Sequence, residues 1–126
     1  MVSMNRVIIA GNLARDPELK ETQNGNPMTV FPVAVSRKWK SSTGEDQKET
    51  SFFRIIVWSS NAKNCAKYLK KGRPVLVEGR LETRSFTGNS GETKYFTQVV
   101  GDKVIFLNNG KNQQQMSEAI EEPAIF

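Results

Sequence analysis

The sequence predicts an all-β domain with one short helix, followed by a disordered C-terminal tail. Three observations lead to this prediction. Apolar, β-branched or alternating stretches bounded by glycine, proline and asparagine recur through residues 1–107, as expected of strands. Only residues 60–70 place apolar side chains at helical spacing. Beyond residue 107 the chain becomes polar and rich in asparagine and glutamine, a composition typical of disorder.

Each strand is predicted from its own local pattern. Turn signals at residues 16–17 and 24–25 place a loop between the first two strands, and residues 41–46 form a second polar loop. Pro32 lies inside the second strand and suggests an edge position or a bulge, and Gly101 suggests a bend in the last strand. The predicted strands are residues 6–10, 28–36, 52–58, 74–84 and 94–107.

The single helix is predicted between the third and fourth strands. Its apolar face consists of Ala62, Cys65, Ala66 and Leu69, a serine at 59 or 60 precedes it, and Gly72 follows its end. Five strands with a helix in this place have the order of an OB-fold, a five-stranded partly open barrel. OB-folds commonly bind oligonucleotides or oligosaccharides across one face.

Composition excludes several classes of chemistry. The chain has no histidine and one cysteine, which argues against a disulfide, the usual zinc sites and histidine-dependent nucleophiles. We therefore predict no catalytic residues, no metal and no cofactor. No run of 18 apolar residues and no signal peptide is found, so the expected location is the cytoplasm.

Charge divides the chain into a basic body and an acidic end. The 126 residues carry a net charge of +5, with a pI near 9.5, which favours an anionic partner. Residues 1–110 hold 17 basic and 10 acidic residues, whereas residues 111–126 have a net charge of −2. We predict a domain over residues 1–107, a disordered linker over 108–120 and a separate tip over 121–126.

Aromatic rings lie beside cations at four places in the predicted domain. In the third strand, alternation separates Phe53, Ile55 and Val57, an apolar core face, from a face with rings at Phe52 and Trp58. Rings stack on bases and cations contact phosphates, so this repeated pairing predicts a nucleic-acid surface. The residues are Arg37, Trp39 and Lys40; Phe52, Arg54 and Trp58; Arg80, Arg84 and Phe86; and Lys94 with Tyr95.

Each group alone also has an ordinary structural explanation. Phe52 or Trp58 could belong to a second core face, and the cations around Trp39 could form a solvated turn. The lysines after residue 66 could be the outer face of an amphipathic helix. The recurrence of all four groups in one chain is what favours nucleic acid.

Taken together, several motifs resemble the bacterial single-stranded DNA-binding protein (SSB) family. They are residues 5–13, 16–18, 24–25, Trp39, 52–58, 68–72 and 77–84, and the resemblance covers residues 4–107 and returns at the last six. It implies an OB-fold homotetramer that wraps single-stranded DNA. It assigns stacking to Trp39, Phe52, Trp58 and Phe86, and basic contacts to Arg6, Lys40, Arg54, Lys71, Arg84 and Lys94.

The resemblance also implies a role for the acidic tip. In addition, this sequence departs from the family's pattern at two positions that are commonly basic. The family's tip docks on replication and repair proteins, and here it consists of Glu121, Glu122, Pro123, Ala124, Ile125 and Phe126. Ser60 and Glu82 stand where basic residues are common in the family, so a lower affinity is expected.

These observations predict a non-enzymatic, sequence-independent single-stranded DNA-binding protein. It would protect and organise DNA at the nucleoid during replication, recombination and repair, and would recruit partner proteins through its tip. One alternative is a primosomal accessory or RNA-binding OB-fold protein, which would not need the tip. Another is a small enzyme such as a nuclease, which the absence of histidine and of clustered carboxylates opposes.

Overall fold

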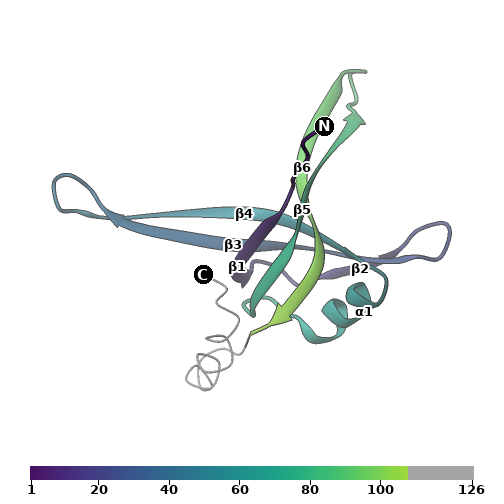
Figure 1. Cartoon of the computed structure of the whole chain (residues 1–126), viewed down its shortest axis with the longest axis horizontal. Coiled ribbons are helices and arrows are strands. Elements are labelled where there is room, and N and C mark those ends of the chain that lie inside the picture. The colour runs from purple at the N-terminus through teal and green to yellow at the C-terminus, as the bar shows by residue number, and fades with distance from the viewer. Residues whose placement is uncertain (108–126) are drawn as a thin grey trace.

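The computed structural model describes residues 1–107, which form six strands and one helix (Figure 1). The predicted linker at 108–120 and tip at 121–126 lie outside the described residues. The elements are β1 (Val7–Leu13), β2 (Glu18–Glu21), β3 (Pro27–Lys40), β4 (Asp46–Trp58), α1 (Ser59–Tyr68), β5 (Pro74–Thr87) and β6 (Thr93–Phe106).

Five of the strands close into a barrel. The sheet order is β1-β5-β6-β4-β3-β2, and an additional pairing of β1 with β3 closes the ring. The closing contact is short, with Asn12 opposite Ala34 and Leu13 opposite Val33. Because α1 lies between the third and fourth strands of this barrel, the predicted OB-fold is confirmed.

Valines, isoleucines and one phenylalanine fill the barrel, and α1 covers one end. Ala62, Cys65 and Leu69 of the predicted helical face are buried, whereas Ala66 is only half-buried. The hydroxyl of buried Thr29 donates a hydrogen bond to the Ala62 carbonyl at 2.7 Å, which ties β3 to α1. Burial raises the pKa of the Cys65 thiol to about 11. The other fully buried residues include Phe31, Val33, Ile55, Val57, Val75, Val77 and Val99.

Four strands extend beyond their predicted bounds, namely β1, β3, β4 and β5, and one strand, β2, was not predicted. β3 and β4 pair without interruption from Met28–Trp58 to Lys40–Asp46, so residues 37–40 continue a strand and do not open a loop. Residues 18–21, predicted as loop, form β2 against β3. All four β2 residues are exposed, so no apolar alternation marks this strand, and only its partner reveals it.

Pro32 lies neither at an outer edge nor in a bulge. Its carbonyl accepts a hydrogen bond from the Ala14 N–H at 2.9 Å. On the side of β3 that faces away from β4, the partner strand changes at this point. It is β2 at Val30 and β1 at Val33. A proline is tolerated here because neither ladder requires an N–H from this residue.

Phe53, which strand alternation places in the core, and Leu81 of β5 both lie beyond the end of the core. Phe53 is 37% exposed and Leu81 is 47% exposed. Both have the parity of core residues, but they are placed where β4 and β5 leave the barrel.

The predicted bend at Gly101 coincides with a register shift, because Glu78 faces Lys103 while Gly79 faces Gly101. Within residues 1–107, no helix is long and apolar enough to span a membrane.

Candidate nucleic-acid interface

Two long hairpins project from the barrel in different directions (Figure 1). One is formed by β3 and β4 and the other by β5 and β6. β4 and β6 are paired with each other only where residues 55–56 meet residues 99–100. We call this short β4–β6 pairing the seam. Beyond the seam the two hairpins separate, and both faces of each hairpin are accessible to a ligand.

The outer face of β4 carries the predicted alternation of rings and cation. Phe52, Arg54, Ile56 and Trp58 share this face because side chains alternate along a strand. Phe52 is 65% exposed, Trp58 is half-buried and Ile56 is buried. Along this face, buried Ile56 lies between Arg54 and Trp58, and the rings of Phe52 and Trp58 are at least partly accessible.

The β5–β6 hairpin continues the same face. Arg84 is opposite Phe96 and Phe86 is opposite Lys94 in the register, and the centroids of the Phe86 and Phe96 rings are 6.0 Å apart. A hollow of about 200 Å³ joins the two hairpins, and its lining residues are Met28, Arg54, Ile56, Trp58, Arg84, Phe96 and Gln98. We call the surface formed by Phe52, Arg54, Trp58, Arg84, Phe86 and Phe96 the aromatic–arginine face.

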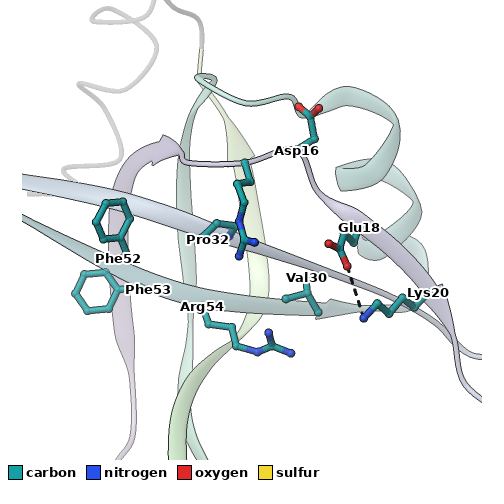
Figure 2. Close-up of a pocket in the computed structure, with 9 residues that line it drawn as sticks. Asp16, Glu18, Lys20, Val30, Pro32, Phe52, Phe53 and Arg54 are labelled. Atoms are coloured by element: carbon teal, nitrogen blue, oxygen red, sulfur yellow. Dashed lines mark ion pairs between the residues drawn. The ribbon is translucent and has the colours of Figure 1, made fainter.

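A second hollow, of about 230 Å³, extends this face from Phe52 across Pro32 towards β2 (Figure 2). It is lined by both acids and bases, among them an exposed ion pair in which Lys20 Nζ lies 3.6 Å from Glu18 Oε2. Lys71 is held nearby, because its backbone N–H donates to Asp16 Oδ1 at 2.7 Å. The remaining lining residues are Arg15, Val30, Pro32, Phe52, Phe53 and Arg54.

Several predicted site residues are placed away from the aromatic–arginine face. Trp39 lies near the tip of the β3–β4 hairpin, with the Arg37 guanidinium 4.8 Å from its ring centroid. Trp39 is opposite Gln47, so it has the parity of Phe53 and lies on the reverse side from Phe52. Tyr95 is 72% exposed but opposite Ser85, so it also lies on the reverse side of its hairpin.

Three of the remaining predicted cations take part in surface ion pairs. Arg6 pairs with Glu78, Arg80 Nη1 lies 3.3 Å from Asp102 Oδ1, and Lys94 Nζ lies 3.5 Å from Glu92 Oε1. Surface pairs of this kind are weak, so each cation can exchange its carboxylate for a phosphate. Lys40, opposite Asp46 at the end of β3, has the parity of Phe52.

Sequence reasoning selected Tyr95 in place of its neighbour Phe96, a member of this face, and it missed Gln98, the buried amide beside the face. The Arg54 guanidinium carbon lies 5.9 Å from the centroid of the Phe96 ring, and Arg54 also hydrogen-bonds to Gln98. The missed signal was parity, because Lys94, Phe96 and Gln98 alternate with Tyr95 along one strand. Applying alternation to β6 would have selected Phe96 in preference to Tyr95.

The surface combines exposed rings with guanidinium groups, an arrangement suited to binding. Within residues 1–107, no group of three or more histidine, cysteine, aspartate or glutamate side chains is placed to hold a metal ion. The lowered pKa of Glu82 comes first from the hydrogen bond donated by Arg84 and next from that of Gln98. An acid held ionised between two such donors is a structural acceptor and is poorly suited to carry a proton.

Comparisons with known proteins agree on one family. A family model described as "Single-strand binding protein family" matches residues 4–107. The "Single-stranded DNA-binding protein" of Oceanobacillus iheyensis is 42% identical over 110 residues, which cover 87% of this chain and 67% of that protein. The "Single-stranded DNA-binding protein 1" of Staphylococcus aureus is 42% identical over 116 residues, covering 90% and 73%.

A solved structure is similar in fold. It is described as "Plasmodium falciparum SSB complex with ssDNA", and it superposes with a TM-score of 0.78 at 30% sequence identity. The match covers 86% of this chain and 98% of the other. The likeness therefore includes the barrel and is not limited to one hairpin.

Proposed function

Because the chain belongs to the single-strand binding protein family, we propose that it binds single-stranded DNA without reading its base sequence. In this role it protects and organises DNA at the nucleoid, in the cytoplasm, during replication, recombination and repair. The observation that carries the proposal is the aromatic–arginine face, on which rings and guanidinium groups from β4, β5 and β6 border one hollow.

The mechanism follows from the two kinds of side chain on this face. Phe52, Trp58 and Phe86 offer ring faces on which any base can stack, so binding tolerates every sequence. Arg54 and Arg84 offer guanidinium groups to the phosphates between those bases. Each phosphate that is neutralised releases counterions, which makes the affinity depend on salt.

We expect a strong preference for single strands over duplexes. Oligo-dT should quench tryptophan fluorescence, and the affinity should fall with salt with a log–log slope of roughly −0.7 for each neutralised phosphate. Duplex DNA should compete poorly, because its bases are not free to stack on the rings. Oligo-dT titrations at several salt concentrations, with duplex and oligo-rU as competitors, measure this.

Equal affinity for duplex and single strand would contradict the proposal. Tighter binding of oligo-rU than of oligo-dT would favour the RNA-binding alternative. Incubating labelled oligo-dT with the protein and magnesium tests for a nuclease, and we expect the oligonucleotide to stay intact.

We further propose that the protein acts as a homotetramer. Residues 7–11 of β1 pair with β5 along one edge, while the pairing with β3 begins only at Asn12. Ile8, which is 48% exposed, lies on this strand, and a strand with an unpaired edge readily pairs with another chain. Sedimentation equilibrium at several protein concentrations determines the assembly directly, and a monomer at all of them would contradict it.

We propose that the tip recruits replication and repair proteins. The carboxylates of Glu121 and Glu122 can contact basic residues of a partner, and Ile125 and Phe126 supply an apolar anchor. Deleting residues 121–126 should abolish partner binding and leave DNA affinity the same or slightly higher, because a local anion that competes with phosphate is removed. Phe126→Ala alone should remove most of the partner binding.

Pull-downs from bacterial lysate with full-length and truncated protein measure this effect. Thermal unfolding and sedimentation of the truncated protein serve as controls, and both should match the full chain. If both forms recover the same replication and repair proteins, the tip is not the docking element.

A further inference from the structure

A chain of side-chain hydrogen bonds connects the two arginines of the aromatic–arginine face. Arg54 Nε donates to Gln98 Oε1 at 3.0 Å, and Gln98 Nε2 donates to Glu82 Oε1 at 2.9 Å. Arg84 Nε donates to the same Glu82 oxygen at 2.7 Å. The chain crosses from β4 through β6 to β5 and so spans the seam where the two hairpins separate.

Both arginines are anchored through Nε, which leaves their outer nitrogens available. Within residues 1–107, the only hydrogen bond from each of the Arg54 and Arg84 guanidinium groups is the one from Nε. An arginine has five N–H donors, and those on Nη1 and Nη2 form the outward fork that contacts phosphate. The anchors therefore fix each group without occupying that fork.

The middle of the chain is the most rigid part of the arrangement. Gln98 is only 3% exposed, so packing fixes its amide in one place. Arg54 is held from a second side, because its guanidinium lies over the Phe96 ring. The Arg84 side chain is 55% exposed, and Glu82 is its only hydrogen-bond acceptor among the described residues.

We propose that Glu82 and Gln98 are positioning residues. They hold the guanidinium groups of Arg54 and Arg84 in the orientation in which both bind phosphates of one single strand. Glu82 thereby raises the affinity for DNA, although it is an acid on a basic surface. This inference rests on the proposed single-stranded DNA binding. The physical reason is that a long side chain already fixed in its bound geometry loses less freedom when the ligand arrives.

A simple charge argument predicts the opposite sign. A carboxylate near the path of the phosphates repels them, and on that argument alone removing Glu82 would tighten binding. The lowered pKa of Glu82 favours its ionised form, in which the side chain only accepts hydrogen bonds, here from Arg84 and Gln98. The direction of the change in affinity therefore decides between positioning and repulsion.

The test compares Glu82→Ala with Glu92→Ala in the full-length protein. Glu92 lies at the turn of the same hairpin and carries the same charge, but its side chain contacts Ser90 and Lys94. We expect Glu82→Ala to weaken oligo-dT binding about 3- to 10-fold. The salt slope should become shallower by roughly 0.7 for each phosphate that an arginine no longer neutralises. Glu92→Ala should leave the affinity unchanged or slightly higher.

A double-mutant cycle separates positioning from a general loss of structure. In an Arg54→Ala/Arg84→Ala background, Glu82→Ala should have no further effect on affinity, because no arginine remains to be positioned. Thermal unfolding of each variant is measured alongside. Should Glu82→Ala fail to fold, Glu82→Met fills a similar volume without an acceptor oxygen and should bind more weakly than the wild type.

Tighter binding by Glu82→Ala, or an undiminished effect of this change in the arginine-free background, would overturn the inference. For Glu82→Met, an affinity at or above that of the wild type would also overturn it. If the wild-type protein itself does not bind oligo-dT, the proposed function is what fails. The two failures are therefore distinguishable in one set of titrations.

Discussion

Phe52→Ala is expected to weaken the binding of oligo-dT by about 1–3 kcal/mol, the usual contribution of one base–aromatic stack. This range corresponds to a roughly 5- to 150-fold increase in the dissociation constant. The ring is 65% exposed, so its removal leaves no buried cavity and the melting temperature should change little. Fluorescence titration and thermal unfolding, carried out on the same preparations, measure both quantities.

Tyr68→Ala is the matched control for this change. Tyr68 is also an exposed ring, at 51%, but it lies at the end of α1 and packs against Phe106. Its removal should leave DNA affinity unchanged. If Phe52→Ala and Tyr68→Ala have equal effects on affinity, stacking is not confined to the aromatic–arginine face.

The two tryptophans extend the same experiment. Trp58→Ala should cause a similar loss of about 1–3 kcal/mol, together with a lower melting temperature, because this ring is half-buried beside Ile56. Trp39→Ala should weaken the binding of long oligonucleotides, because Trp39 lies near the tip of the β3–β4 hairpin. A Trp58 variant that unfolds while its folded fraction binds normally would make Trp58 a core residue.

Gly79→Ala is expected to have the largest effect on stability. A Cβ at this position would lie 1.9 Å from the Val100 carbonyl oxygen and 2.9 Å from its carbon. Both atoms belong to the backbone of β6, and Gly79 is held from the other side by its pairing with Val7 of β1. The strands must move apart, so we expect a loss of about 3 kcal/mol in the free energy of unfolding.

Gly88→Ala provides the comparison. The nearest atom to a Cβ at Gly88 is 3.4 Å away, in the flexible side chain of Glu92, so its free energy of unfolding should change by less than about 0.5 kcal/mol. Urea unfolding monitored by tryptophan fluorescence measures both variants. If Gly79→Ala proved as stable as Gly88→Ala, β5 and β6 would be able to move apart at Gly79 at a lower cost in free energy than the close contact indicates.

The Gly79 position also matters for function, because the β5–β6 hairpin leaves the barrel at this point. Gly79 and Gly101 face each other where the register shifts. Beyond them, β5 carries Arg84 and Phe86 on the aromatic–arginine face. A displacement at Gly79 would move this half of the face relative to Arg54 on β4. DNA affinity of the folded fraction should therefore fall together with stability.

Local patterns in the sequence determined the fold class and one half of the candidate site. The β4 alternation placed Ile55 and Val57 in the core, and it placed Phe52 and Arg54 on the opposite face. The helical spacing of residues 60–70 located α1, and the order of elements indicated an OB-fold, which the closed barrel confirms. The family resemblance is confirmed as well. Such features are accessible because a strand or helix repeats within a few residues.

Contacts between distant segments were decided only by the tertiary structure. β2 exists because β3 offers it a partner, and Phe53 is partly exposed because β4 leaves the barrel beside it. The hydrogen bond from Arg54 to Gln98 joins residues 44 positions apart, and that from Gln98 to Glu82 joins residues 16 apart. These contacts depend on the register of strands that only the closed barrel brings together. In the sequence, Glu82 is an acid where the family has basic residues; the folded chain places it in hydrogen-bond contact with Arg84 and Gln98.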